Sequence, residues 1–116
     1  MRTVIAGSRT ATKNDTLTAI AACPWPITTV LCGMAQGADT WGERWAKDHG
    51  VPVEYYPAKW QTFGKRAGLI RNETMVNQSE AVLAVWDGKS RGTAYTIRMA
   101  QAAGRNLFVW RLDEGA

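Results

Sequence analysis

Five short apolar runs recur along the chain, separated by longer segments in which apolar residues return at helical spacing. The runs are rich in β-branched and aromatic residues, and their short length favours strands over helices. They are nearly continuous rather than alternating, which is typical of parallel strands covered on both faces. The predicted strands are residues 3–6, 27–32, 51–56, 81–86 and 106–112.

Helix signals fill the intervals between these strands. Asn14 and Asp15 are good N-caps for a first helix, and Pro24 stops it. Gly50 and Gly104 follow two others, where glycine commonly ends a helix. The predicted helices run from after Asn14 or Asp15 to before Pro24, and over residues 38–49, 68–78 and 93–103.

The resulting order alternates strand and helix along the whole chain. Such alternation predicts an α/β fold with right-handed crossovers. A chain of 116 residues supplies one domain. We therefore expect a single Rossmann-like domain over residues 1–116, with a five-stranded parallel sheet and helices on both faces. The longest expected loop, residues 57–67, holds three basic residues and Trp60, an indole that could stack on a nucleotide base.

Composition narrows the class of ligand. The net charge of +4 suits an anionic partner, but the basic residues are dispersed, which argues against nucleic acid. Cys23, Cys32 and the one histidine, His49, form no zinc-binding spacing, so we expect no metal and no cofactor. A signal-peptide pattern is absent and no apolar stretch approaches the roughly 20 residues that span a bilayer. We expect a cytoplasmic protein that does not associate with a membrane.

Unusual residues collect directly after three predicted strands. In open α/β sheets, ligands bind beyond the carboxyl ends of the strands. Gly7, Ser8 and Arg9 follow the first strand, where glycine allows close approach and the other two can donate to phosphate. Gly33 and Gly37 follow the second and resemble a phosphate-binding turn that leads into a helix.

The turn after the fourth strand is the strongest single candidate for a phosphate-binding segment. Ser90, Arg91, Gly92 and Thr93 combine hydroxyls, a guanidinium and a glycine where a helix begins, as an anion at a helix N-terminus requires. The alternative is that Ser90 or Thr93 serves only as an N-cap.

Four further polar residues could take part in a site. Asp39 either stabilises the helix dipole or accepts a hydrogen bond from a ribose hydroxyl. Arg71, Asn72 and Glu73 are consecutive, so they cannot share one helix face and have separate roles. We expect Arg71 to lie near the ends of the first and fourth strands and to grip phosphate.

Taken together, these motifs resemble the small YspA-like branch of the SLOG superfamily over about residues 3 to 111. The ordered set is Gly7-Ser8-Arg9, Gly33-x-x-x-Gly37-Ala38-Asp39, Trp60, Gly64-Lys65-x-Ala67-Gly68-x-x-Arg71-Asn72-x-x-Met75 and Ser90-Arg91-Gly92-Thr93.

The resemblance implies a Rossmann-like fold and a nucleotide-derived ligand. Several relatives sense signalling nucleotides in defence systems, and the superfamily includes LOG-type phosphoribohydrolases and DNA-processing proteins. Arg71 corresponds to the arginine of the LOG-type catalytic pocket. The LOG-type catalytic glutamate is replaced here by Thr96, so the resemblance does not favour an enzyme unless Glu73 or Asp39 substitutes.

Three functions stay open in this order. The first is binding of a phosphate-bearing nucleotide derivative, such as an ADP-ribose-like molecule or a cyclic nucleotide signal, by a sensor or a sequestering protein. The second is a small hydrolase that cleaves an N-glycosidic or phosphate bond of such a ligand, and the third is a single-stranded nucleic-acid binder. The expected ligand-binding residues are Gly7, Ser8, Arg9, Gly33, Gly37, Asp39, Arg71, Asn72, Ser90, Arg91, Gly92 and Thr93.

The chain is also expected to form a homodimer or a higher oligomer. Six tryptophans in 116 residues leave apolar surface that is hard to cover in one small domain. Trp41 and Trp45 lie four residues apart on one helix face, and we expect Trp41 or Trp45 in the contact.

Overall fold

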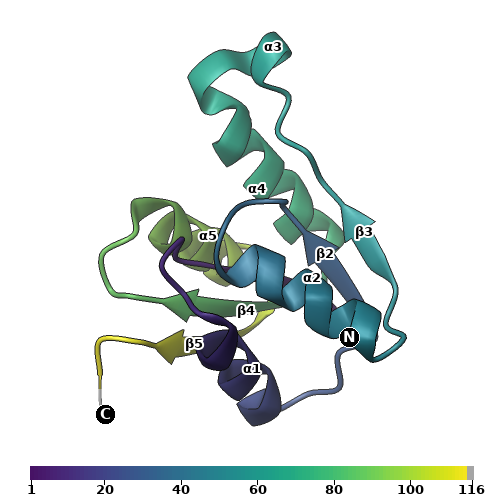
Figure 1. Cartoon of the computed structure of the whole chain (residues 1–116). Helices are drawn as coiled ribbons and strands as arrows, with labels where there is room; N and C mark the ends of the chain where they lie inside the picture. The colour runs from purple at the N-terminus through teal and green to yellow at the C-terminus, as the bar shows by residue number, and fades with distance from the viewer. Residues whose placement is uncertain (115–116) are drawn as a thin grey trace.

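All five strands form, and they pair in parallel in the order β3-β2-β1-β4-β5 (Figure 1). The computed structural model describes residues 1–114. The strands are β1 (Arg2–Gly7), β2 (Thr29–Cys32), β3 (Val53–Tyr55), β4 (Ala81–Trp86) and β5 (Asn106–Arg111). The helices are α1 (Lys13–Ala22), α2 (Ala38–Asp48), α3 (Trp60–Phe63), α4 (Ala67–Gln78) and α5 (Arg91–Ala102), with a 3-10 turn η1 (Gly64–Arg66) before α4.

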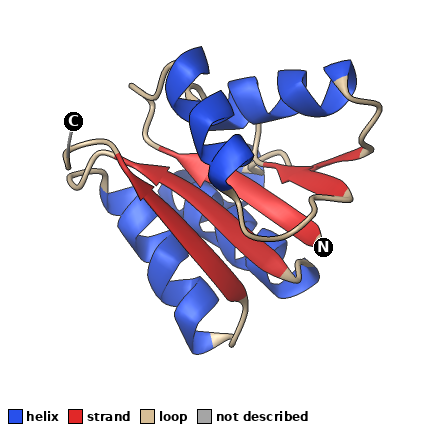
Figure 2. Ribbon diagram, turned by 90° about the horizontal axis from the view of Figure 1, so that it is seen from below, coloured by secondary structure: helices blue, strands red, loops and turns tan. Residues whose placement is uncertain are grey.

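Helices cover both faces of this sheet (Figure 2). The central strand β1 shows why, since its side chains alternate between two cores. Ile5 packs into a cluster with residues of α1 and α2, whereas Val4 and Ala6 pack into a second cluster with residues of α4 and α5. The expected α/β fold of Rossmann-like topology is confirmed. Within residues 1–114, no helix is both long and apolar enough to cross a membrane.

The start of α1 differs from the prediction. Its N-cap is Thr12 rather than Asn14 or Asp15. The Thr12 hydroxyl accepts a hydrogen bond from the N–H of Asp15 at 3.1 Å, and the Asp15 carboxylate accepts one from the N–H of Thr12 at 2.9 Å. This is a capping box, in which Asp15 serves at the third helical position rather than at the cap.

The segment predicted as a long loop, residues 57–67, is mostly helical. It contains α3 and η1, which lead directly into α4. Trp60 is the first residue of α3 and is 59% exposed. Four residues carry too weak a periodicity to predict so short a helix from the sequence.

The strand order places a topological switch point between β1 and β4. From β1, the chain builds β2 and β3 on one side and later β4 and β5 on the other. Gly7 at the end of β1 pairs with Val85 near the end of β4. Because the connections leave these two ends toward opposite faces, a crevice opens between them, where ligands of such sheets bind.

Candidate ligand-binding site

A cavity of about 140 Å³ lies at this switch point and is called the inner cavity below. It brings together four segments that are far apart in the sequence: the turns after β1, β2 and β4, and the first turns of α4. It is lined by Ala6, Gly7, Arg9, Ala35, Asp39, Arg71, Asn72, Ser90, Gly92, Thr93 and Thr96. Eight of the twelve expected site residues are therefore gathered around one small space.

Of the other four, Gly33 lines a neighbouring cavity, and Ser8, Gly37 and Arg91 line none of the cavities described here. Ser8 is buried, and its hydroxyl accepts a hydrogen bond from the N–H of Asp87 at 3.0 Å. It therefore ties the turn after β1 to the turn after β4. Arg91 is exposed at the start of α5.

Gly37 lets the turn before α2 pack closely on the turn after β1. Its φ of +80° lies in the left-handed region that favours glycine. A Cβ on Gly37 would come within 2.3 Å of the carbonyl oxygen of Ser8, so a side chain there meets backbone. The two turns are thus packed against each other at the edge of the inner cavity.

The N-terminus of α5 forms another wall. Ser90 is its N-cap, and its hydroxyl accepts from the N–H of Thr93 at 3.4 Å. The Asp87 carboxylate accepts from the N–H groups of Lys89 and Ser90, which lowers the pKa of Asp87. Ser90 therefore caps the helix and also lines the cavity, so the two alternatives coexist. A Cβ on Gly92 would meet no atom within 4 Å, so the first turn is open to an approaching group.

Arg71 is the residue on which the cavities converge. Its Nη1 donates to the carbonyl oxygen of Gly33, and its Nε donates to Oδ1 of Asn72 at 2.7 Å. Within residues 1–114, Nη2 has no hydrogen-bond or ion-pair partner. The guanidinium is thus held on two sides and has donor capacity left for a ligand.

Asp39 lies beside this guanidinium and is only 5% exposed. Burial raises the pKa of its carboxyl to about 6, while the charge of Arg71 and the N–H groups of Ala35 and Gly33 oppose the rise. Cys32, whose thiol donates to the carbonyl oxygen of Asp39 at 3.8 Å, is also buried. Burial raises the pKa of this thiol to about 11. Cys32 is thus a buried neutral thiol.

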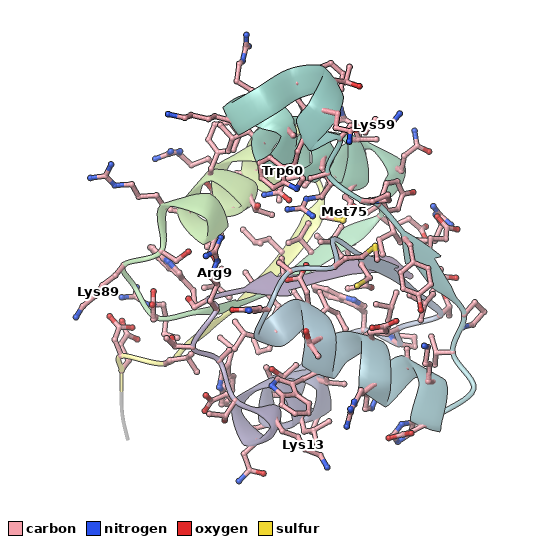
Figure 3. All side chains as sticks on the ribbon, turned by 45° about the horizontal axis from the view of Figure 1, so that its top comes forward. Arg9, Lys13, Lys59, Trp60, Met75 and Lys89 are labelled. Atoms are coloured by element: carbon pink, nitrogen blue, oxygen red, sulfur yellow. The ribbon has the colours of Figure 1, made fainter. Side chains whose placement is uncertain are left out.

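A wider opening of about 670 Å³, the outer cavity, adjoins the inner one. The two share Arg9, Ala35, Arg71, Asn72 and Gly92. Figure 3 shows Arg9 and Trp60 on the same side of the molecule. Trp60 lines this outer cavity, as base stacking would require, together with the basic residue Lys65.

Met34 is a residue of the outer cavity that the sequence did not reveal. It is 58% exposed and has a φ of 64°, which is uncommon for a residue other than glycine. Such strained backbone concentrates at functional sites. Neither the residue type nor its spacing signals exposure or a positive φ, so this position was not predicted from the sequence.

The position of the LOG-type glutamate is filled by a buried threonine. Thr96 donates from its hydroxyl to the carbonyl oxygen of Gly92 at 3.1 Å and lines the inner cavity. Among the described residues, Asp39 supplies the one carboxylate in that lining. Glu73 is exposed and lines none of the cavities described here.

Comparisons with known proteins identify the family of this chain. Residues 1–63 match the YspA, cpYpsA-related SLOG family, YAcAr. Gene 61 protein of Mycobacterium phage D29 is 40% identical over 81 residues, which are 65% of this chain and 65% of that protein. The SPbeta prophage-derived protein YoqJ of Bacillus subtilis (strain 168) is 38% identical over 61 residues, which are 53% of this chain and 31% of that protein.

The chain therefore spans less than two thirds of the length of either relative. No solved structure matches it significantly. The family match covers more than half of the chain. The chain belongs to the YspA, cpYpsA-related SLOG family.

Proposed function

Starting from membership in this SLOG family, we propose that the domain binds a phosphate-bearing, nucleotide-derived small molecule at the switch point between β1 and β4. The observation that carries the proposal is the placement of Arg71. Its guanidinium, fixed by Gly33 and Asn72, faces the same small cavity as the open first turn of α5. A guanidinium and a helix N-terminus that converge on one space are suited to a phosphate.

Each side of the cavity then has a role. Arg71 and the N–H groups at the start of α5 bind the phosphate, with Arg9 at the rim. Asp39 accepts a hydrogen bond from a sugar hydroxyl, and the exposed indole of Trp60 stacks on a base in the outer cavity. Ser8 and Gly37 hold the turns around the cavity in place. Arg91, exposed at the start of α5, attracts the anion as it approaches.

Binding, by a sensor or by a protein that sequesters the molecule, is favoured over catalysis. The carboxylate expected of a LOG-type enzyme is replaced by Thr96. The second candidate, a hydrolase, rests on Asp39, since a buried carboxyl with a pKa of about 6 can act as a general acid or base near neutral pH.

Two measurements test the proposal. Mass spectrometry of small molecules released by heat from the purified protein should detect a phosphate-bearing nucleotide derivative. Calorimetric titration with ADP-ribose should show binding that Arg71→Ala weakens and that Arg98→Ala, an exposed arginine of α5 outside the cavities, leaves unchanged. Chromatography of ADP-ribose after prolonged incubation separates the two candidates, because only the hydrolase converts it to products.

A further inference from the structure

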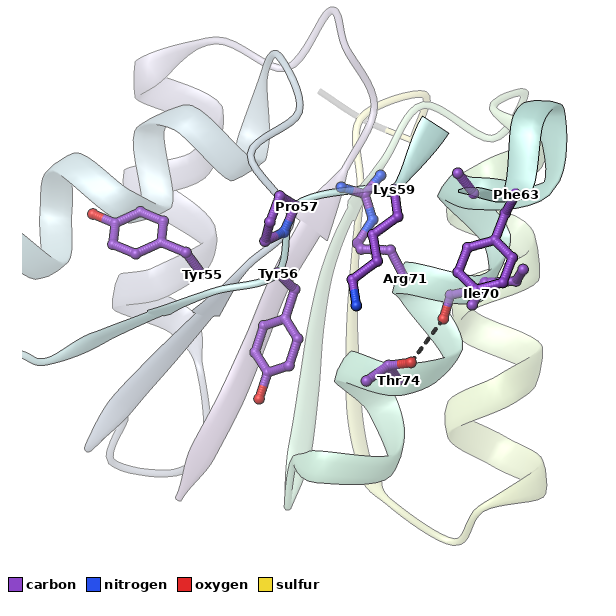
Figure 4. A pocket seen from close by; sticks show the side chains of 9 residues that line it. Tyr55, Tyr56, Pro57, Lys59, Phe63, Ile70, Arg71 and Thr74 are labelled. Carbon is purple, nitrogen blue, oxygen red and sulfur yellow. Dashed lines mark hydrogen bonds between the residues drawn. The ribbon is translucent and has the colours of Figure 1, made fainter. Parts of the chain in front are cut away.

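A third cavity, of about 390 Å³, lies between the segment that leaves β3 and the flank of α4 (Figure 4). It is called the flank cavity below. Its volume falls in the range of roughly 300–1,000 Å³ that is typical of small-molecule sites. Its walls include Tyr56, Pro57, Phe63 and Ile70. The cavity is therefore shaped mainly by rings and aliphatic groups.

The aromatic wall is held in place before any ligand arrives. The Tyr56 hydroxyl donates to Oε1 of Glu54 at 3.0 Å, and Glu54 also accepts from Arg2. The N–H of Tyr56 donates to the carbonyl oxygen of Cys32 at 2.9 Å, which extends the pairing of β3. A fixed ring of this kind offers a flat face at little cost in conformational entropy.

The side of the cavity across from Tyr56 has an exposed aromatic ring, Phe63, and the cationic side chain of Lys59. Phe63 is 43% exposed, and Lys59 extends into the space between Tyr56 and Thr74 (Figure 4). Lys59 has no acidic partner within residues 1–114. An apolar slot into which one donor extends suits a heteroaromatic ring that carries acceptor atoms.

Two residues, Pro57 and Arg71, line both the flank cavity and the outer cavity. Arg71 therefore stands at the partition between two spaces that each offer an exposed aromatic side chain, Phe63 on one side and Trp60 on the other. A molecule that occupied both spaces would place the group between its rings at this guanidinium. Such a linker is best stabilised if it is anionic.

We propose that the flank cavity is a second ring-binding subsite, and that the ligand class is a two-ring nucleotide whose rings are joined through a phosphate linker. One ring stacks on Trp60 in the outer cavity, the linker lies at Arg71, and the second ring enters between Tyr56 and Phe63. This inference rests on the proposed function and names its ligand class.

The test compares two probes that share one linker. ADP-ribose carries one base on a pyrophosphate, and diadenosine pyrophosphate carries two. Calorimetric titration of the whole chain should give an affinity for the two-ring probe that is higher by at least about tenfold, or about 1.4 kcal/mol.

A pair of adjacent variants separates the flank cavity from general effects on α4. Thr74→Trp fills the cavity from an exposed helical position, whereas Glu73→Trp places the same ring on the neighbouring exposed position, outside the cavities. Thr74→Trp should remove the advantage of the two-ring probe and leave the affinity for ADP-ribose unchanged. Phe63→Ala, which removes an exposed wall, should reduce the same advantage without a risk to the core.

The outcomes distinguish the two proposals. If ADP-ribose binds through Arg71 but both probes bind equally, or if Thr74→Trp and Phe63→Ala both retain the two-ring advantage, the flank subsite is wrong and the proposed function stands. If neither probe binds the unaltered protein, both proposals are overturned.

Discussion

Arg71 of α4 donates from its guanidinium to the backbone carbonyl of Gly33, which lies 38 positions earlier at the end of β2. This bond joins the end of β2 to α4 and holds the guanidinium where Arg71 lines both the inner and the outer cavity. The absence of a side chain at Gly33 makes the contact possible. A Cβ there would lie 3.0 Å from Nη1 of Arg71 and 2.9 Å from Oδ2 of Asp39.

Gly33→Ala should therefore displace Arg71 and weaken the binding of ADP-ribose by about tenfold. The nearest atoms are side-chain ends that can shift, so we expect a small change in stability, on the order of 1 kcal/mol. Calorimetric titration and thermal unfolding measure the two effects. An unchanged affinity in a folded Gly33→Ala protein would mean that this contact does not position the ligand-binding group.

Two other glycines should respond in opposite ways. Gly92→Val places a side chain over the open first turn of α5, where a Cβ would meet no atom within 4 Å, so binding should be lost while the melting temperature changes little. Gly37→Val meets the carbonyl of Ser8 at a positive φ and should lower the free energy of unfolding by about 1–3 kcal/mol or more. Full nucleotide affinity in Gly92→Val would place the phosphate elsewhere.

The buried carboxyl of Asp39 predicts a pH dependence of stability. Its pKa in the folded protein, about 6, lies above its ordinary value of 3.8, so the folded state binds more protons between these values. The free energy of unfolding should therefore fall as the pH rises from about 4 to about 6, and the Asp39 contribution should then stay level. At about 1.4 kcal/mol per pH unit, the fall attributable to Asp39 is about 3 kcal/mol.

Asp39→Asn is the matched control, because it keeps the shape of the side chain and removes the titration. Urea unfolding of both proteins at a series of pH values gives the difference in stability directly. The wild-type protein should lose stability relative to the variant over this pH range. Parallel curves would show that the pKa of Asp39 is not raised.

Self-association is expected through the groove between α1 and α2. Its lining includes Leu17, Trp41 and Trp45, and the latter two are each only partly buried. Sedimentation at micromolar concentration should show a dimer or a larger species. Trp41→Ala should weaken this association, whereas Trp60→Ala should not, because Trp60 lies outside the groove. A clean monomer of the unaltered protein would contradict this expectation.

The sequence predicted the fold well because strand and helix periods alternate without interruption. The near-continuous apolar run of β4, for example, matches its burial between two helix layers. The strand order was not predictable in the same way, since a run such as β1 carries no mark of which strands will pair with it. The N-cap of α1 was misplaced because Thr12, Asn14 and Asp15 are all capping residues, and the reciprocal hydrogen bonds between Thr12 and Asp15 select Thr12.

The site was predictable as far as it follows strand ends. The turns at Gly7 and Ser90 could be placed together because parallel strands bring their carboxyl ends to one edge. The strained Met34 and the flank cavity depend on how α3 and α4 pack against the segment that leaves β3. No spacing in the sequence encodes that packing.

The most direct test of the account is a calorimetric titration of ADP-ribose into the unaltered protein, Arg71→Ala and Arg71→Lys. Loss of the guanidinium should weaken binding by at least about tenfold at an unchanged melting temperature, and lysine should recover only part of it, because it cannot form two parallel hydrogen bonds with a phosphate. Equal affinity of Arg71→Ala and the unaltered protein, with both fully folded, would contradict the assignment of the phosphate to Arg71.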